Sequence, residues 1–179
     1  MSARRDLALL ALFDDLELQL EGLRLEDRAH DVAALAEAEY AEVTLEARLL
    51  GSLRAPLALR LDGDLLVRGD LLRAGQGWVL LGDDRQQPWL VLSAAVVTVA
   101  GLGSRSTAPE ARTVLARLRI GSALRALATE HGDVLLHLRA GRRVEGRLGR
   151  VGADFVEAVT AGGTEVVPFG ALSAVQGRG

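Results

Sequence analysis

Five arginines lie close together in the C-terminal part of the chain, where they could bind phosphate groups. They are Arg139, Arg142, Arg143, Arg147 and Arg150. The first three surround Gly141, where the sequence predicts a tight turn, and the other two follow on the next predicted strand. A guanidinium is planar and can donate two parallel hydrogen bonds to one phosphate. The sequence therefore predicts an RNA-binding surface here. The alternative is a solvated strand face that nearby acidic side chains neutralise.

Charge is distributed unevenly along the chain. Residues 1–50 carry 12 acidic and 5 basic side chains, residues 51–101 carry 5 of each, and residues 102–179 carry 7 acidic and 11 basic side chains. All 21 basic residues are arginine, so lysine-dependent chemistry is excluded. This asymmetry indicates either an anionic partner at the C-terminal end or pairing between acidic helices and basic strands of the same protein.

No residue pattern in the sequence suggests catalysis. The absence of cysteine excludes disulfides and thiolate chemistry. His30, His131 and His137 lack the spacing of metal ligands, and His137 alternates with Leu136 and Leu138, which predicts a solvated imidazole. The segment 101–106 (GLGSRS) lacks the lysine of a phosphate-binding loop and is interpreted as a linker. We therefore expect a protein that is not an enzyme and that needs no metal or cofactor.

The N-terminal part predicts helices with one apolar stripe. Residues 6–23 carry the stripe, which consists of Leu9, Phe13, Leu16, Leu20 and Leu23. Its spacing suits either a dimer interface or packing on the protein's own strands. A second helix is predicted at about 27–40. The apolar run 7–13 is too short for a membrane span or signal peptide, so we expect a cytoplasmic protein with no membrane partner.

The remainder of the chain contains one pattern written twice, at residues 56–101 and 133–177. The matched pairs are Gly63 with Gly141, Gly69 with Gly146, Gly75 with Gly152, Trp78 with Phe155, Ala95 with Ala171, and Val99 with Val175. A repeated sequence unit is a unit of folding. The sequence therefore predicts two domains of the same architecture.

Each copy predicts a short helix followed by five strands. The helix at about 45–54 begins after Thr44 as N-cap, and its counterpart begins after Ser122. Apolar residues alternate along the first two strands of each copy, and Gly69 and Gly146 lie in mid-strand, which predicts a sharp bend. Short connections before the fifth strands are predicted at Ser93-Ala94 and Phe169-Gly170. The predicted fold class is mainly β with helices: a tandem pair of closed five-stranded SH3-like barrels, each preceded by a short helix.

These predictions divide the chain into four segments. They are an acidic helical segment at 1–40, a first barrel at 41–101, a linker at 102–110 and a second barrel at 111–179. Trp78, Trp89, Phe155 and Phe169 are expected in the core or at an interface.

The strand pattern resembles the Sm-like family of small β-barrels, which includes the Hfq and LSm types. The segment VLLHLRAGRRVEGRLGRVGADFV is similar to the first motif of the family, and VVPFGALSAV is similar to the second. The resemblance implies an Sm-like barrel in each copy, edge-to-edge assembly and the binding of RNA or protein. The family's Lys-His pair at the junction before the fifth strand is replaced by Phe169-Gly170, so its uridine site does not carry over.

Together these observations predict a non-catalytic binding protein of the Sm-like type, with RNA as the expected ligand of the five arginines. The alternative is a protein-interaction or assembly scaffold that binds no nucleic acid. Open strand edges and the N-terminal apolar stripe predict a homo-oligomer, either a dimer or a small pseudo-ring.

Overall fold

The computed structural model describes residues 34–85, 87–108, 115–130, 132–139 and 141–178. The chain divides into two units, Met1–Val43 and Thr44–Gly179. In the first unit, residues 34–41 are helical, as predicted. The predicted helix at 6–23 and its five apolar residues lie outside the described residues. All the strands among the described residues belong to the second unit.

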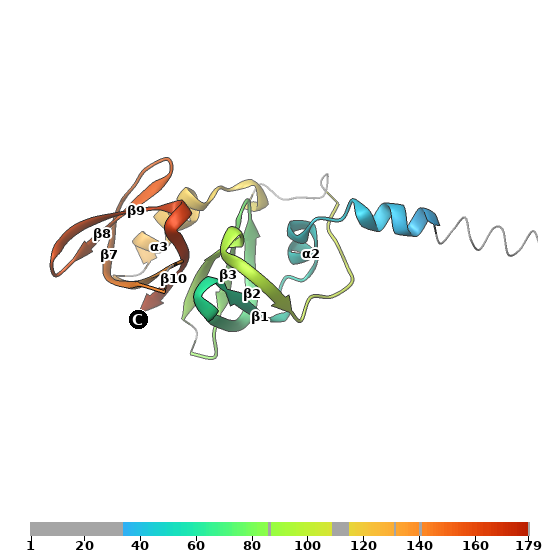
Figure 1. The fold of residues 1–179 in the computed structure, drawn as a ribbon, viewed down its shortest axis with the longest axis horizontal. Helices are drawn as coiled ribbons and strands as arrows, with labels where there is room; N and C mark the ends of the chain where they lie inside the picture. Colours follow the sequence, from blue (N-terminus) through green and yellow to red (C-terminus); the bar gives the residue numbers. More distant parts are fainter. Residues whose placement is uncertain (1–33, 86, 109–114, 131, 140, 179) are drawn as a thin grey trace, which may run out of the picture. The chain divides into compact units, whose positions relative to one another are not determined.

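The second unit contains two copies of a short helix followed by five strands (Figure 1). The first half comprises α2 (Leu45–Gly51), β1 (Pro56–Leu61), β2 (Leu66–Gly75), β3 (Trp78–Gly82), β4 (Pro88–Leu92) and β5 (Val96–Ala100). The second half comprises α3 (Ile120–Glu130), β6 (Asp133–Leu138), β7 (Arg143–Val151), β8 (Phe155–Thr160), β9 (Gly163–Pro168) and β10 (Leu172–Arg178). A single 3₁₀ turn precedes the fifth strand of each half, at Ser93–Ala95 and at Phe169–Ala171. The predicted short connections are confirmed.

The ten strands form one antiparallel sheet in the order β5-β1-β2-β3-β4-β10-β6-β7-β8-β9. Each half thus uses the same order, with its fifth strand beside its first. The mainly β fold with helices is confirmed, but the prediction of two closed barrels is wrong, because the sheet is open and continuous. The physical reason is the edge of β4. Its hydrogen bonds go to β10 of the other half and not to β5 of its own half.

The mid-strand glycines allow neighbouring strands to approach closely. A Cβ atom on Gly69 would lie 2.2 Å from the carbonyl oxygen of Gly82 on β3, and one on Gly146 would lie 2.3 Å from that of Val159 on β8. Real Cβ atoms do not come this close to backbone oxygens, so no larger residue fits without moving a strand. Gly69 and Gly146, which the sequence repeat matched, are therefore required for the same steric reason in both halves.

The two halves share side chains across the β4–β10 junction, where Val91 lies opposite Ala174 and Leu90 opposite Val175. The apolar core of the first half includes Ala174 from β10, and that of the second half includes Trp78 and Leu90 from β3 and β4. Successive side chains of a strand point to opposite faces of the sheet. Strand β4 is consequently buried on both faces, which explains its unbroken apolar sequence.

One of the two predicted helix caps is confirmed. The hydroxyl of Thr44 accepts a hydrogen bond of 3.1 Å from the backbone N–H of Ala47, as an N-cap does. The prediction that Ser122 caps the second helix is wrong. Helix α3 begins at Ile120, so Ser122 lies inside its first turn, where its N–H donates to the carbonyl oxygen of Arg119.

Candidate functional site

Four of the five arginines singled out from the sequence form ion pairs. Arg139 contacts Asp62 at 3.4 Å, Arg142 contacts Glu165 at 2.9 Å, Arg147 contacts Asp133 at 3.9 Å, and Arg150 contacts Glu157 at 3.0 Å. Arg143 is exposed and forms no ion pair with any described residue. The structure therefore brings four of these arginines to acidic partners on the strands and turns around them, as the alternative interpretation of the set expects.

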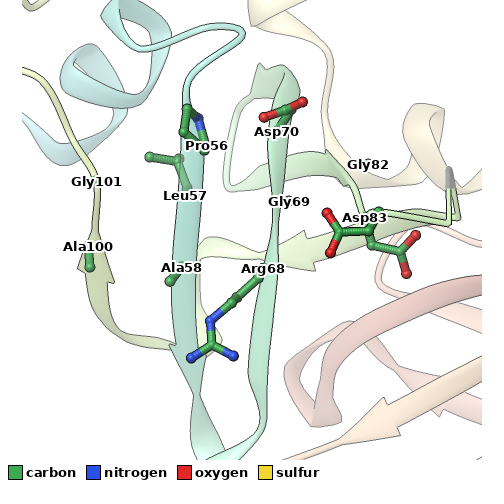
Figure 2. Close-up of a pocket in the computed structure, with 11 residues that line it drawn as sticks. Pro56, Leu57, Ala58, Arg68, Gly69, Asp70, Gly82, Asp83, Ala100 and Gly101 are labelled. Atoms are coloured by element: carbon green, nitrogen blue, oxygen red, sulfur yellow. The ribbon is translucent and has the colours of Figure 1, made fainter.

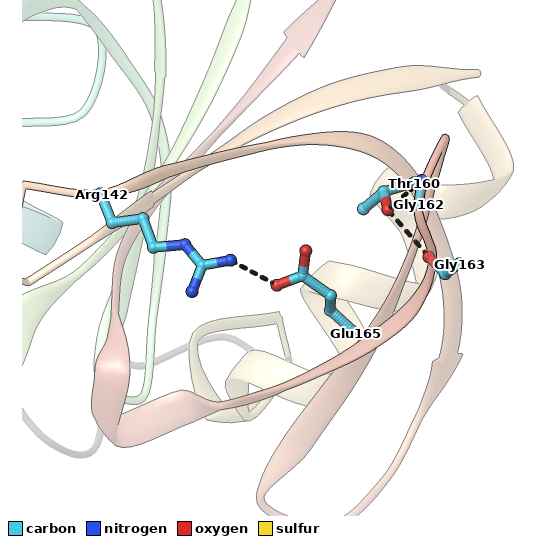
Figure 3. Close-up of polar contacts among 5 residues, drawn as sticks. All are labelled: Arg142, Thr160, Gly162, Gly163 and Glu165. Atoms are coloured by element: carbon cyan, nitrogen blue, oxygen red, sulfur yellow. Dashed lines mark hydrogen bonds and ion pairs between the residues drawn. The ribbon is translucent and has the colours of Figure 1, made fainter.

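Two of these pairs connect parts of the second half: Arg150 on β7 pairs with Glu157 on the neighbouring β8, whereas Arg142, just before β7, pairs with Glu165 on β9. Figure 3 shows the Arg142 guanidinium pointing at the Glu165 carboxylate on β9. The same figure shows the turn after β8, where the Thr160 hydroxyl donates to the carbonyl oxygen of Gly163 at 2.9 Å. Arg150 donates two hydrogen bonds to Glu157, and these lower the pKa of that carboxyl. Exposed pairs of this kind contribute little to stability, but they reduce the positive charge available to a ligand.

A small pocket lies where the turns of the two halves meet, and we call it the inter-half pocket. Its volume is about 180 Å³. It is lined by Asp62, Gly63, Asp64, Leu65 and Leu66 of the first half and by His137, Leu138, Gly141, Arg142, Arg143 and Ser173 of the second. Gly63 and Gly141 both have positive φ angles, +73° and +77°, as the predicted turns require. Because both halves contribute lining residues, the pocket exists only where the two halves are joined.

The interior of the inter-half pocket contains a buried histidine. His137 is only 6% exposed, so the prediction of a solvated imidazole is wrong. Its strand β6 pairs with β10, and the face that carries His137 is covered by the first half, including the ring of Trp89 at a centroid distance of 5.1 Å. Burial lowers the pKa of His137 below its usual 6.5, so the ring is neutral at pH 7.

One nitrogen of this imidazole has no partner. Nε2 of His137 is buried and has no hydrogen-bond partner in the described part of the chain. The nearby Gln176 amide nitrogen donates to Gln87 at 3.0 Å. A nitrogen of a neutral imidazole accepts or donates a hydrogen bond according to the tautomer, so Nε2 is available to a ligand.

A second buried polar group lines the same pocket. Ser173 is 1% exposed, and its hydroxyl likewise lacks a hydrogen-bond partner within the described ranges. Buried polar groups are normally paired, and two unpaired ones in a single pocket point to a ligand or to ordered water. By the sequence repeat, Arg60 and Val97 occupy the equivalent positions in the first half, and both are exposed. Sequence reasoning missed this pocket because the burial of its residues arises from the junction between the halves.

A larger hollow of about 630 Å³ lies along β1 and β2 near the end of β5 (Figure 2). Its charged lining residues include Arg68, Asp70 and Asp83. In Figure 2 the Arg68 guanidinium and the carboxylates of Asp70 and Asp83 lie apart and do not converge on one point. Nowhere in the described ranges do three or more His, Asp or Glu side chains gather as a metal site would require. This hollow therefore offers no defined chemistry.

No protein-family model matches the sequence, and no curated protein is significantly similar to it. Among the helices that the structure describes, none is long and apolar enough to cross a membrane.

Proposed function

We propose that this chain is a non-catalytic binding protein of the Sm-like kind that takes a base of single-stranded RNA into the inter-half pocket. The observation that carries the proposal is the pair of buried, unpartnered polar groups, Nε2 of His137 and the hydroxyl of Ser173. The relationship to Sm-like units is supported by the order of the strands in each half and by the short helix that precedes them.

The pocket has the size and the surroundings that one base needs. Its volume of about 180 Å³ is below the roughly 300–1,000 Å³ of pockets for drug-sized ligands, so it suits one small flat group. Leu65, Leu66 and Leu138 provide apolar walls, while Nε2 of His137 can accept a hydrogen bond from a base. Recognition of unpaired RNA bases uses this combination of apolar contact and hydrogen bonds to base edges.

Positive charge lies beside the pocket for the adjoining phosphate. Arg143 lines the pocket and is exposed, and no ion pair with a described residue occupies it. Arg142 also lines the pocket, although it is paired with Glu165. In this proposal, Arg143 is therefore the main phosphate-binding residue of the predicted arginine set.

Fluorescence anisotropy with labelled oligoadenylate, oligouridylate and oligocytidylate tests the proposal. We expect Ser173→Ala to weaken binding by roughly 2-fold to 10-fold, which corresponds to one hydrogen bond of about 0.5–1.5 kcal/mol. Thr129→Ala, which removes a hydroxyl from α3 and not from the pocket, serves as the matched control and should leave affinity unchanged. The absence of RNA binding by the wild-type protein, or equal affinity in the Ser173 variant, would contradict the proposal.

An assembly scaffold is the second candidate, and the strand edges favour it. Within the described residues, β5 and β9 are the outermost strands of the sheet, and each has one unpaired edge. By the repeat, these are the same two edges that pair at the β4–β10 junction. Pairing of β9 with β5 of another chain would reproduce that junction and build a ring or a filament.

Light scattering on edge variants tests the assembly. Val97 on β5 and Val166 on β9 are 60% and 61% exposed, and a lysine at either position should disfavour edge pairing. Val159→Lys is the matched control, because Val159 is 47% exposed but lies on β8, which has partners on both sides. We expect an oligomer for the wild type and the control, and smaller species for both edge variants. A monomeric wild type would exclude the scaffold.

A further inference from the structure

A second group of arginines, which the sequence patterns did not single out, surrounds the start of α3. Arg117 ends a 3₁₀ turn, Arg119 directly precedes α3, and Arg125 lies in its second turn. All three are exposed. Together with the loop that contains Val151, Gly152 and Ala153 they line an open hollow of about 810 Å³. We call this the α3 arginine surface.

The position of Arg125 is electrostatically unfavourable in the protein alone. Its Nη1 atom donates to the carbonyl oxygen of Val151 at 3.4 Å, and its guanidinium lies 3.6–3.7 Å from where a Cβ atom on Gly121 would be. The side chain therefore folds back over the first turn of α3, where it remains exposed. The N-terminal end of a helix carries partial positive charge, so it repels a cation placed there.

No described acidic group offsets this concentration of positive charge. The first turn of α3 has no acidic residue, and none of the described residues that line the hollow is acidic. None of these three arginines forms an ion pair with a described residue. By contrast, Arg147 and Arg150 are each within 4 Å of a carboxylate. An anion on the α3 arginine surface would relieve the repulsion between these positive charges.

We propose that the α3 arginine surface binds phosphate groups of a single-stranded RNA backbone. The guanidinium fork suits phosphate oxygens, and three forks spread over an open hollow suit a chain of phosphates better than a single enclosed anion. This inference rests on the proposed function for the identity of its ligand. It adds a second contact surface, made of residues that do not line the inter-half pocket.

The salt dependence of RNA binding tests the inference. Each phosphate contact to a single strand contributes a slope of about −0.7 to the dependence of log Kobs on log salt concentration. Replacing Arg117, Arg119 and Arg125 together with glutamine should therefore make the slope less steep by about 2, with an oligouridylate probe. The control replaces Arg60, Arg147 and Arg150 with glutamine. It changes the net charge equally but removes only arginines that are already ion-paired.

The outcomes separate this inference from the proposed function. An unchanged slope in the α3 variant, or an equal change in the control, overturns the inference and leaves the inter-half pocket standing. If the slope changes in the α3 variant while Ser173→Ala binds RNA as the wild type does, the α3 arginine surface is supported. The inter-half pocket is then excluded as the RNA-binding site. If the wild-type protein binds no RNA at any salt concentration, both fail. Circular dichroism of each variant verifies that the sheet is intact, and single substitutions replace the triple variant if it does not fold.

Discussion

The imidazole of His137 on β6 stacks against the indole of Trp89 on β4, with ring centroids 5.1 Å apart and ring planes inclined by 31°. Strand β10 lies between these two strands in the sheet. The contact therefore bridges the junction at which the halves are joined, and it removes one face of His137 from water. Because the histidine is buried there, the junction should be sensitive to pH.

We expect the free energy of unfolding to fall as the pH drops below about 6.5. Burial lowers the pKa of His137 from its usual 6.5, Arg143 and Arg178 lower it further, and the hydrogen bond to Gln176 opposes them. The unfolded chain therefore binds a proton at a pH where the folded protein does not. The contribution of the neutral His137 to the free energy of unfolding is complete above about pH 6.5. It is lost as the pH falls from that value through the lowered pKa of the folded protein.

Urea denaturation at about pH 7.5 and about pH 5.5 measures this effect, because those values bracket the usual pKa of histidine. His137→Phe retains a ring against Trp89 but does not titrate, so its stability should fall less between the two pH values. The same loss in both proteins would show that other groups cause it.

Truncation of Trp78 should destabilise both the core and the segment that precedes α3. Trp78 is 5% exposed in the core of the second half, and its indole N–H donates to the carbonyl oxygen of Leu118 at 2.8 Å. We expect Trp78→Ala to lower the free energy of unfolding by about 3–5 kcal/mol. Trp78→Phe retains an aromatic ring, so its loss should be smaller than that of Trp78→Ala by about 1–3 kcal/mol. Thermal denaturation measures both, with Val97→Ala as the exposed control, which should stay within about 0.5 kcal/mol of the wild type.

Alanine at Gly69 or Gly146 should be strongly destabilising, and to a similar degree. Each added Cβ would come within 2.2–2.3 Å of a backbone oxygen on the neighbouring strand, and a strand moves less readily than a side chain. Gly170 is the matched control, because nothing lies within 4 Å of a Cβ atom built there and its φ is not positive. We expect a loss of at least about 2 kcal/mol at the two strand positions and about 0.5 kcal/mol or less at Gly170. Tolerance of alanine at Gly69 would contradict the strand spacing described here.

A charge at the β4–β10 junction should separate the halves or unfold the protein. Ala174 on β10 is fully buried within the core of the first half, opposite Val91. Ala174→Glu places a carboxylate in that core, and we expect a loss of roughly 3–5 kcal/mol, as for other unpaired buried charges. Ala94→Glu is a control at an exposed position. Chemical denaturation followed by tryptophan fluorescence measures the loss, and an unchanged midpoint for Ala174→Glu would show that the junction is not buried in solution.

Much of the fold could be predicted because its signals are local. Alternation of Leu57, Leu59 and Leu61, the glycine turn at Gly63 and the cap at Thr44 depend on neighbours a few residues away, and the structure confirms each of them. The repeat added matched strand positions in the second half. The error at Ser122 is also local in origin, since α3 begins two residues before the capping residue that the pattern favoured.

The candidate site could be predicted only in part. The sequence identified the arginines around Gly141. It also indicated the alternative that nearby acidic side chains neutralise them. It could not pair Arg142 with Glu165 or Arg139 with Asp62, because those partners are distant in the chain. It missed Arg117, Arg119 and Arg125 because they form no periodic pattern and gather only where a helix start meets the loop after β7.

The sequence by itself determined that this chain folds as two copies of a helix and five strands, because strand alternation, turns and close-packed glycines are properties of short segments. The tertiary structure alone decided that the copies share one sheet. Whether the edge of β4 bonds to β5 of its own half or to β10 of the other depends on the free energies of two distant pairings that use the same backbone groups. That choice buries His137 and Ser173 and creates the inter-half pocket.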